Sequence, residues 1–304
     1  MKPKIRGTNR MFSYSLHVFL WAFSFLPFWL LYLLSDIGYF FVYYLFRYRR
    51  GVVRTNLHNA FPEKERREIK RIERKFYRHL VDVSVEFYKL WHMPESVIRK
   101  RCKFKNPELP LHYLRAGRDV LTILGHYGNW EWLSSSSLYL NDFHFLVLYK
   151  PLHDKQMNRL TRFLRAHFGA IPVAKSNMLR EINHYCTWKE HFMLCLVADQ
   201  TPHGSSLDFW MTFLNQETPV YKGAEKIAGK YDMPVLFLKI QKRRRGYYEA
   251  EYLVACDHPR ALPPGELTER HTRMLETIIR ENPEYWLWSH RRWKHKRPND
   301  TPLH

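Results

Sequence analysis

The chain has 304 residues, and its 49 lysine and arginine residues against 29 aspartate and glutamate residues give a formal charge of +20. Its content of 45% hydrophobic and 16% aromatic residues excludes a disordered chain, a collagen-like fibre and a small disulfide scaffold. The four cysteines form no CxxC pair, so neither a zinc ribbon nor a redox pair is indicated. The charge indicates an anionic partner: nucleic acid, an anionic membrane surface, a phosphorylated substrate or an acidic carrier protein.

An apolar segment near the N-terminus favours a membrane. No charged side chain occurs between Met11 and Ser35, which is long enough to cross a hydrocarbon core as a helix. The apolar run continues through residues 40–44, where a cleaved signal peptide would show small residues. We therefore predict an uncleaved membrane anchor over residues 1–48 and one domain over residues 49–304.

The path of this anchor stays open. Basic residues flank the segment on both sides, so the positive-inside rule does not decide the orientation of a single crossing. The same flanks suit a segment that dips into the membrane and returns, with a bend at Pro27 or at residues 35–38. A buried core helix is the remaining alternative.

After the anchor, the pattern predicts an α/β fold. Residues 62–80 carry apolar side chains at three- and four-residue steps, which is typical of an amphipathic helix. Short apolar runs then alternate with helical stretches, which indicates a mostly parallel sheet flanked by helices. The expected strands are 120–124, 145–148, 193–197, 235–240 and 248–254; the last two form a hairpin with a basic tip at 242–246, and a final helix covers 268–281.

The first candidate catalytic group follows the strand at 120–124. His126 and Glu131 lie beyond its carboxyl end, the edge at which α/β sheets place their sites. With Asn129 near the N-cap of the next helix, the two side chains can converge. A carboxylate bonded to one imidazole nitrogen leaves the other free to take a proton from a hydroxyl. The alternative is a capping histidine and a carboxylate favoured by the helix dipole.

A second group follows the next strand. Tyr149 and Lys150 precede a helical stripe of Arg159, Arg162 and Arg165, which recur every three residues. Guanidinium groups on one helix face can hold phosphate or an acidic carrier protein. A solvated helix face is the alternative.

Two more segments complete the set of candidates. Asp199 and Gln200 follow the strand at 193–197 and are expected at the same edge, with a plain turn as the alternative. Residues 286–294 mix tryptophan with basic residues, as interfacial belts do, and a nucleic-acid patch or a packed terminus are the alternatives. The 17 histidines show no metal-ligand spacing, so no metal site is predicted.

Together these motifs resemble the lipid A biosynthesis acyltransferase family of late lauroyl and myristoyl transferases. They occur in family order over nearly the whole chain, although Lys150 stands where arginine is frequent and residues 213–215 read Phe-Leu-Asn where Phe-Phe-Gly is usual. The motifs are His126-x4-Glu131, Tyr149-Lys150-Pro151 with Arg159, Asp199-Gln200, the aromatic loop through Phe213, and residues 283–294.

The resemblance implies a fold similar to glycerol-3-phosphate acyltransferases and no cofactor. It implies an acyl carrier protein thioester as donor, the hydroxyacyl chain of a phosphorylated glycolipid as acceptor, and a place on the cytoplasmic face of the inner membrane. His126 would be the general base with Glu131 as its partner, and Arg159 or backbone N–H groups near Gly128 would bind the developing oxyanion. The expected substrate-binding residues are Arg159, Asp199, Tyr149, Lys150, Asn129 and Gln200.

Three other functions remain open. One is acyl transfer to another membrane lipid, such as an aminolipid or a glycosylated phospholipid. A second is a basic, membrane-tethered nucleic-acid-binding protein, although no helix-turn-helix, RRM or zinc pattern accompanies the charge, so no nucleic-acid partner is predicted. A third is a catalytically silent scaffold on the same fold.

Overall fold

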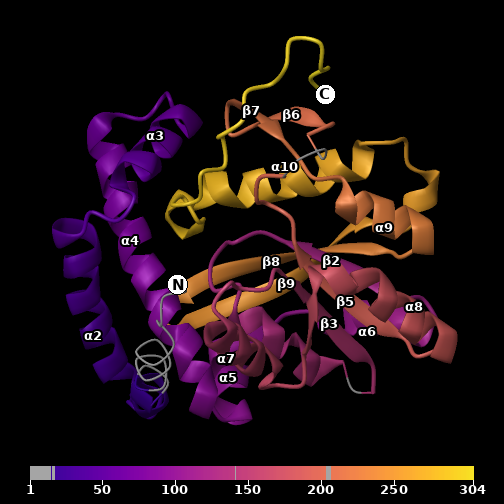
Figure 1. Ribbon diagram of the computed structural model, residues 1–304, viewed down its shortest axis with the longest axis horizontal. Coiled ribbons are helices and arrows are strands. Elements are labelled where there is room, and N and C mark those ends of the chain that lie inside the picture. Colours follow the sequence, from indigo (N-terminus) through magenta and orange to yellow (C-terminus); the bar gives the residue numbers. More distant parts are fainter. Residues whose placement is uncertain (1–14, 16–17, 141, 203–206) are drawn as a thin grey trace, which may run out of the picture.

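The computed structural model in Figure 1 describes residue 15 and residues 18–140, 142–202 and 207–304. Its α-helices are α2 (Phe28–Phe40), α3 (Arg50–Ala60), α4 (Arg66–Lys89), α5 (Glu95–Arg101), α6 (Glu108–Arg115), α7 (Lys155–Ala166), α8 (Met178–Trp188), α9 (Gly223–Tyr231) and α10 (Glu266–Glu281). Shorter helical turns are η1 (Phe41–Leu45), η2 (Leu90–His92), η3 (Trp132–Tyr139), η4 (Lys175–Asn177), η5 (Pro259–Ala261) and η6 (Pro283–Tyr285). The strands are β1 (Cys102–Phe104), β2 (Val120–Leu124), β3 (His144–Tyr149), β4 (Ile171–Ala174), β5 (Phe192–Val197), β6 (Trp210–Phe213), β7 (Gln216–Pro219), β8 (Val235–Arg244) and β9 (Tyr247–Cys256).

Among the described residues, seven strands form one sheet in the order β1-β9-β8-β2-β5-β3-β4. Neighbouring strands are parallel except for the β8–β9 hairpin, which is antiparallel. The predicted mostly parallel sheet flanked by helices is therefore confirmed, including the hairpin around the basic tip. The likeness to glycerol-3-phosphate acyltransferases remains a prediction.

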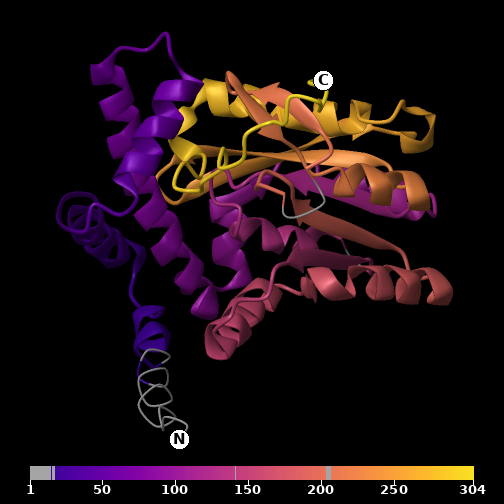
Figure 2. The same ribbon diagram turned by 45° about the horizontal axis from the view of Figure 1, so that its top comes forward.

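Helices bury the central strands, whose side chains are apolar on both faces, as expected for parallel strands. Helices α6 and α9 contact β2, and α10 contacts β8 and β9. Figure 2 shows α10 lying over these two strands. The strand β2 therefore sits deep in the core, which gives the loop after it a rigid base.

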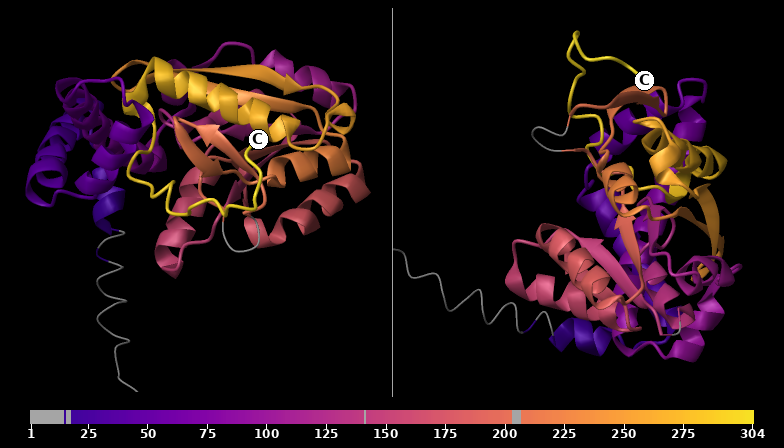
Figure 3. Two further views of the ribbon diagram at one scale, coloured as in Figure 1. Left: turned by 90° about the horizontal axis from the view of Figure 1, so that it is seen from above. Right: turned by 90° about the vertical axis from the view of Figure 1, so that its right-hand side faces the viewer.

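The N-terminal helices α2, α3 and α4 gather at one end of the molecule, as Figure 3 shows. Residues 18–23 are helical, residues 24–26 form a turn, and α2 begins after Pro27. Lys89 of α4 donates from Nζ to the carbonyl oxygens of Ser24 (2.8 Å) and Leu26 (2.9 Å). The helical run is thus interrupted just before Pro27, one of the two positions considered for a bend, whereas residues 35–38 lie inside α2. Residues 1–14 of the predicted anchor lie outside the described residues.

Within the described part of the chain, Phe28–Leu45 is the one helical run that is long and apolar enough to cross a membrane. Its 18 residues have a mean hydropathy of 1.4, and only 22% of the run is buried. One side packs on α4, where the Ser35 hydroxyl donates to Asp82 at 2.8 Å. The other side exposes large apolar side chains, including Trp29, Leu33, Ile37, Phe40 and Leu45. Length and composition make this run a candidate anchor.

Candidate active site

The sheet register brings two loops together at one edge. Leu124, the last residue of β2, pairs with Val197, the last residue of β5, in a parallel ladder. Residues two positions beyond these strand ends therefore lie side by side, and they are His126 and Asp199. His126 Nδ1 lies 2.6 Å from Asp199 Oδ1, and the His126 backbone N–H donates to Oδ2 at 2.8 Å.

Asp199 is held as a buried carboxylate. Trp286 Nε1 donates a further hydrogen bond to its Oδ2 at 2.8 Å. Burial by itself would raise the pKa of Asp199, but attraction to His126 and the three hydrogen bonds outweigh it and lower that pKa to about 2. The ionised carboxylate has no hydrogen to donate, so it accepts the Nδ1–H of His126 and leaves Nε2 with a free lone pair.

The Nε2 side of His126 faces the accessible side of the loop, where 17% of the imidazole side chain is exposed. The amide nitrogen of Gln200 lies 3.3 Å from Nε2, and the Trp130 ring meets the imidazole edge-on at 5.2 Å between centroids. Gln200 is exposed, so its side chain is free to move aside for a hydroxyl group. The arrangement suits removal of a proton from an incoming hydroxyl.

Two glycines are sterically required in the loop that carries His126. A Cβ at Gly125 would lie 2.6 Å from Leu275 Cδ1 and 3.3 Å from Asp199 Oδ2. Gly128 has φ +59°, and a Cβ there would lie 2.9 Å from Ile240 Cγ2. Without side chains at these positions, α10 and β8 can close on the loop and fix its path.

The C-terminal segment packs on the same loop. The Gly128 backbone N–H donates to the Tyr285 carbonyl at 3.0 Å, and the Leu287 N–H donates to the His126 carbonyl at 3.1 Å. Trp286 and Trp288 are 2% and 0% exposed, so these tryptophans form a packed terminus and not an interfacial belt. The Gly128 N–H is already used, which removes it as the expected oxyanion donor.

Glu131 does not meet His126 as expected. Its carboxylate accepts two hydrogen bonds from Arg165 of α7, from Nε at 2.8 Å and from Nη2 at 2.7 Å. The physical reason is that Glu131 lies at the N-terminal end of η3, on the side of the loop that faces α7, while Asp199 occupies the position next to Nδ1. The structure therefore corrects the predicted partner of His126 from Glu131 to Asp199.

The remaining predicted residues lie in different surroundings. Asn129 is fully buried and lies two residues before Glu131, the N-cap of η3. Its Oδ1 accepts a hydrogen bond from the Trp132 N–H at 3.1 Å, and its Nδ2 donates to Glu86 at 2.7 Å and not toward the exposed side. Tyr149 is buried at the end of β3, close to the same sheet edge. Lys150 and Arg159 are exposed, and their side chains have no hydrogen-bond partner among the described residues.

A comparison of the chain with known protein families finds one match. The model for the bacterial lipid A biosynthesis acyltransferase family covers residues 1–295. The chain belongs to this family. It is therefore an acyltransferase, and family membership implies an acyl donor and a lipid acceptor. A comparison with curated proteins finds no match.

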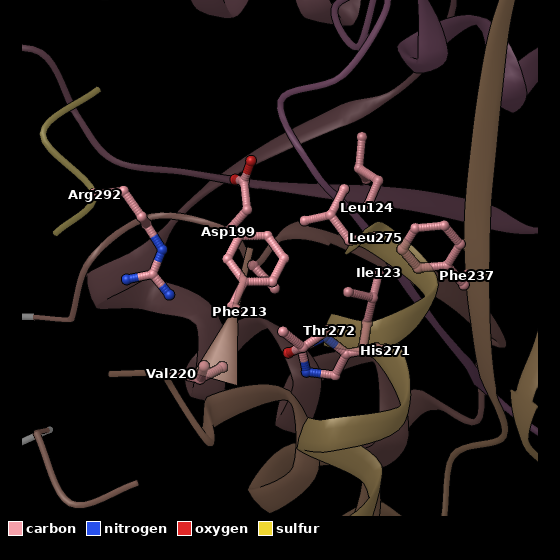
Figure 4. Close-up of a pocket in the computed structure, with 11 residues that line it drawn as sticks. Ile123, Leu124, Asp199, Phe213, Val220, Phe237, His271, Thr272, Leu275 and Arg292 are labelled. Atoms are coloured by element: carbon pink, nitrogen blue, oxygen red, sulfur yellow. The ribbon is translucent and has the colours of Figure 1, made fainter. Parts of the chain in front are cut away.

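Behind Asp199 the acyltransferase has a small cavity of about 10 Å³, drawn in Figure 4. Arg292 and His271 line it, and both are almost fully buried. Arg292 Nη2 donates to the Pro219 carbonyl at 2.7 Å, but its Nε and Nη1 have no hydrogen-bond partner among the described residues. The space holds about one water molecule. This cavity is therefore too small to hold an acyl chain.

Sequence reasoning missed the role of the buried C-terminal residues in the site of this acyltransferase. Trp286 was noted only as part of a basic, aromatic tail, and its bond to Asp199 has no local sequence signal. His290 is similar: its Nε2 lies 3.3 Å from the Thr201 backbone nitrogen, and burial is the main cause that lowers its pKa to about 4. It is neutral at physiological pH and adds no positive charge beside His126.

The Glu131–Arg165 pair supports the site by joining η3 to α7. Only 13% of the Glu131 side chain and 21% of the Arg165 side chain are exposed, so removing one partner leaves a mostly buried, unpaired charge. We expect Glu131→Gln to lower the free energy of unfolding by about 3 kcal/mol. The double variant Glu131→Gln/Arg165→Gln should recover much of this loss, because neither charge remains. Thermal or urea unfolding measures both, and a double variant less stable than the single one would contradict the pairing.

Proposed function

We propose that this acyltransferase moves a fatty acyl chain from an acyl carrier protein thioester to the hydroxyl of a hydroxyacyl chain on a lipid A precursor, with His126 as general base. The observation that carries the proposal is the His126–Asp199 pair at the end of β2 and β5. Asp199 holds Nδ1–H, and Nε2 faces the accessible side. Family membership supplies the class of reaction.

The proposed chemistry needs no covalent intermediate. His126 Nε2 takes the proton from the acceptor hydroxyl, and the hydroxyl oxygen attacks the thioester carbonyl. The carbon–sulfur bond then breaks, and the leaving thiolate takes the proton back from the imidazolium. Asp199 stabilises the imidazolium between these steps through its short bond to Nδ1.

The charge that develops on the carbonyl oxygen needs a donor. We assign this role to Arg159, whose exposed guanidinium lies on α7, the helix that Glu131 ties to the loop through Arg165. We assign Lys150, which follows β3 at the same sheet edge, to a phosphate of the acceptor. The incoming hydroxyl would displace the Gln200 side chain from His126 Nε2, and Gln200 would then bind the substrate.

The anchor and the surface charge fit the same proposal. Residues 1–48 would attach the enzyme to the cytoplasmic face of the inner membrane, and residues 49–304 would form the acyltransferase domain. An anionic bilayer contributes about 1 kcal/mol per nearby lysine or arginine. A net charge of +20 also favours an acidic carrier protein and a phosphorylated glycolipid.

Donor binding should weaken with salt. We expect the Kd for acyl carrier protein to rise at least about threefold between roughly 0.05 and 0.3 M salt, because screening reduces attraction between exposed charges. Titration of the detergent-solubilised enzyme with labelled carrier protein measures this. Arg162→Gln removes one exposed charge on α7 and should slightly reduce the dependence of Kd on salt concentration. Salt-independent binding would argue against an acidic donor.

Mass spectrometry tests the proposal directly. Membranes that hold the enzyme are incubated with a tetra-acylated lipid A precursor and acyl-acyl carrier protein. We expect the precursor to gain the mass of one acyl chain, and membranes without the enzyme serve as control. Parallel reactions contain an aminolipid, a glycosylated phospholipid, or acyl-coenzyme A in place of the carrier protein. Acyl transfer only to another lipid would show that the proposed acceptor is wrong. Transfer only from acyl-coenzyme A would show that the proposed donor is wrong.

A further inference from the structure

A buried carboxylate, Glu86 of α4, lies between the N-terminal apolar helix and the His126 loop. Glu86 is 0% exposed. Its Oε1 accepts a hydrogen bond from the Tyr32 hydroxyl of α2 at 2.8 Å. Its Oε2 accepts one from Asn129 Nδ2 and one from the Tyr248 hydroxyl of β9, both at 2.7 Å. One carboxylate therefore joins α2, the sheet and the loop.

The α4 helix holds the loop at further points. The indole Nε1–H of Trp132 donates to the Glu86 carbonyl at 3.0 Å. The Trp132 backbone N–H donates a hydrogen bond to Asn129 Oδ1. This bond fixes the orientation of the Asn129 amide, so that its Nδ2 faces Glu86. His79 Nε2 lies 3.1 Å from the Gly128 carbonyl. The loop segment that follows His126 is thus bound to α4 through its backbone and side chains.

Glu86 is poised to change charge near neutral pH. Burial is the main cause that raises its pKa to about 7; Asp82 also raises it, and Tyr248, Lys242 and Tyr32 lower it. Cys102 lies close enough to interact with Glu86 electrostatically, but burial keeps this thiol neutral. All three side-chain partners donate hydrogen bonds, and the Asn129 amide nitrogen cannot accept one, so the contacts suit the ionised carboxylate.

We propose that α2 helps to hold the catalytic loop through the chain Tyr32–Glu86–Asn129, which makes Tyr32 and Glu86 positioning residues for acyl transfer. The inference rests on the proposed function for the reaction it serves. An apolar helix that only tethers the enzyme needs no hydroxyl that donates to a buried carboxylate. Here the candidate anchor supplies one of the groups that fix Glu86, and Glu86 fixes the loop.

The test compares Tyr32→Phe with the wild type from pH 9 to pH 6. Phenylalanine keeps the ring but removes the donor to the ionised Glu86, so the pKa of Glu86 rises further. At pH 9 the carboxylate is ionised in both proteins and still accepts hydrogen bonds from Asn129 and Tyr248. The kcat ratio of variant to wild type should then be close to 1. At pH 6 the ratio should fall by about tenfold or more, the cost of one hydrogen bond to a charge. A pH effect that is the same in both proteins cancels in this ratio.

Matched variants separate positioning from a loss of structure. Ser35→Ala removes a different hydrogen bond between α2 and α4, the one from Ser35 to Asp82, and leaves the partners of Glu86 in place. The kcat ratio of this variant to the wild type should be the same at every pH. Gly246→Ala disturbs Tyr32 from outside, because a Cβ there would lie 1.9 Å from the Tyr32 hydroxyl. It should reproduce the fall seen with Tyr32→Phe, which keeps the test usable if that variant does not fold.

Hydrogen exchange gives a readout that does not depend on activity. The amides of residues 125–132 should exchange faster in Tyr32→Phe than in the wild type at pH 6, and equally fast at pH 9, without any substrate. If the wild type fails to acylate the lipid A precursor, the proposed function fails while this measurement still decides the role of Tyr32. A pH-independent ratio in both exchange and kcat for Tyr32→Phe would overturn the inference.

Discussion

Replacing His126 by alanine is expected to lower kcat for acyl transfer by a factor of about 10²–10⁴, the usual contribution of a general base. The loss follows from the geometry, because Nε2 of His126 is the basic nitrogen that faces the accessible side while Nδ1 is bound to Asp199. The KM for the donor should change little, since the imidazole is not assigned to thioester binding. Transfer of radiolabelled acyl chains measures both constants.

Added imidazole provides the control for this variant. The alanine leaves a space beside Asp199 and Trp130, and exogenous imidazole in that space should restore part of the lost rate. The same imidazole should not accelerate the wild type. Circular dichroism and membrane flotation should show that the variant still folds and attaches. Turnover equal to wild type without imidazole would refute the assignment of His126.

Replacing Asp199 by asparagine is the second change with a large expected effect, again about 10²–10⁴ in kcat. Asparagine keeps the shape but loses the negative charge that holds Nδ1–H and supports the imidazolium. The NH₂ group of the asparagine cannot accept a hydrogen bond from His126 or Trp286, which both donate to Asp199 in the wild type. The imidazole would therefore turn away or carry its hydrogen on Nε2. A base whose lone pair points at residue 199 cannot accept the substrate proton.

Glu131→Gln is the matched comparison for Asp199→Asn, because we expect only the Asp199 carboxylate to act on His126 directly. If Glu131 acts through Arg165 alone, its loss in kcat should stay below about tenfold when measured at a temperature where the variant is folded. Adding Arg165→Gln should restore stability without a further loss in rate. A larger loss from Glu131→Gln than from Asp199→Asn would reverse the roles that we assign to these carboxylates.

Much of the fold follows from local sequence pattern. The strands β2, β5, β8 and β9 were predicted because their apolar runs are short and bounded by turns, and the basic residues 242–246 marked the hairpin. The short strands β1, β4, β6 and β7 were not predicted, since three or four residues carry too little periodicity. The expected helix after Glu131 is the 3₁₀ segment η3, in which four consecutive serines give no amphipathic pattern.

The position of the site could be predicted from the sequence, but the carboxylate that pairs with His126 could not. His126 and Asp199 both follow strand ends, and that signal placed them at one edge. Their contact depends on β2 and β5 being neighbours in register, which the order of strands in the chain does not reveal. The short sequence distance to Glu131 suggested a different partner, but a distance along a loop does not fix where a side chain points.

The contact between Trp286 and Asp199 bears on how the enzyme is made. Ribosomes release the chain from its N-terminus, and domains fold as their residues emerge. The apolar run Phe28–Leu45 is synthesised long before Trp286, without which Asp199 lacks one of its three hydrogen bonds. The carboxylate that supports His126 therefore receives its full set of hydrogen bonds only after residue 286 has been synthesised.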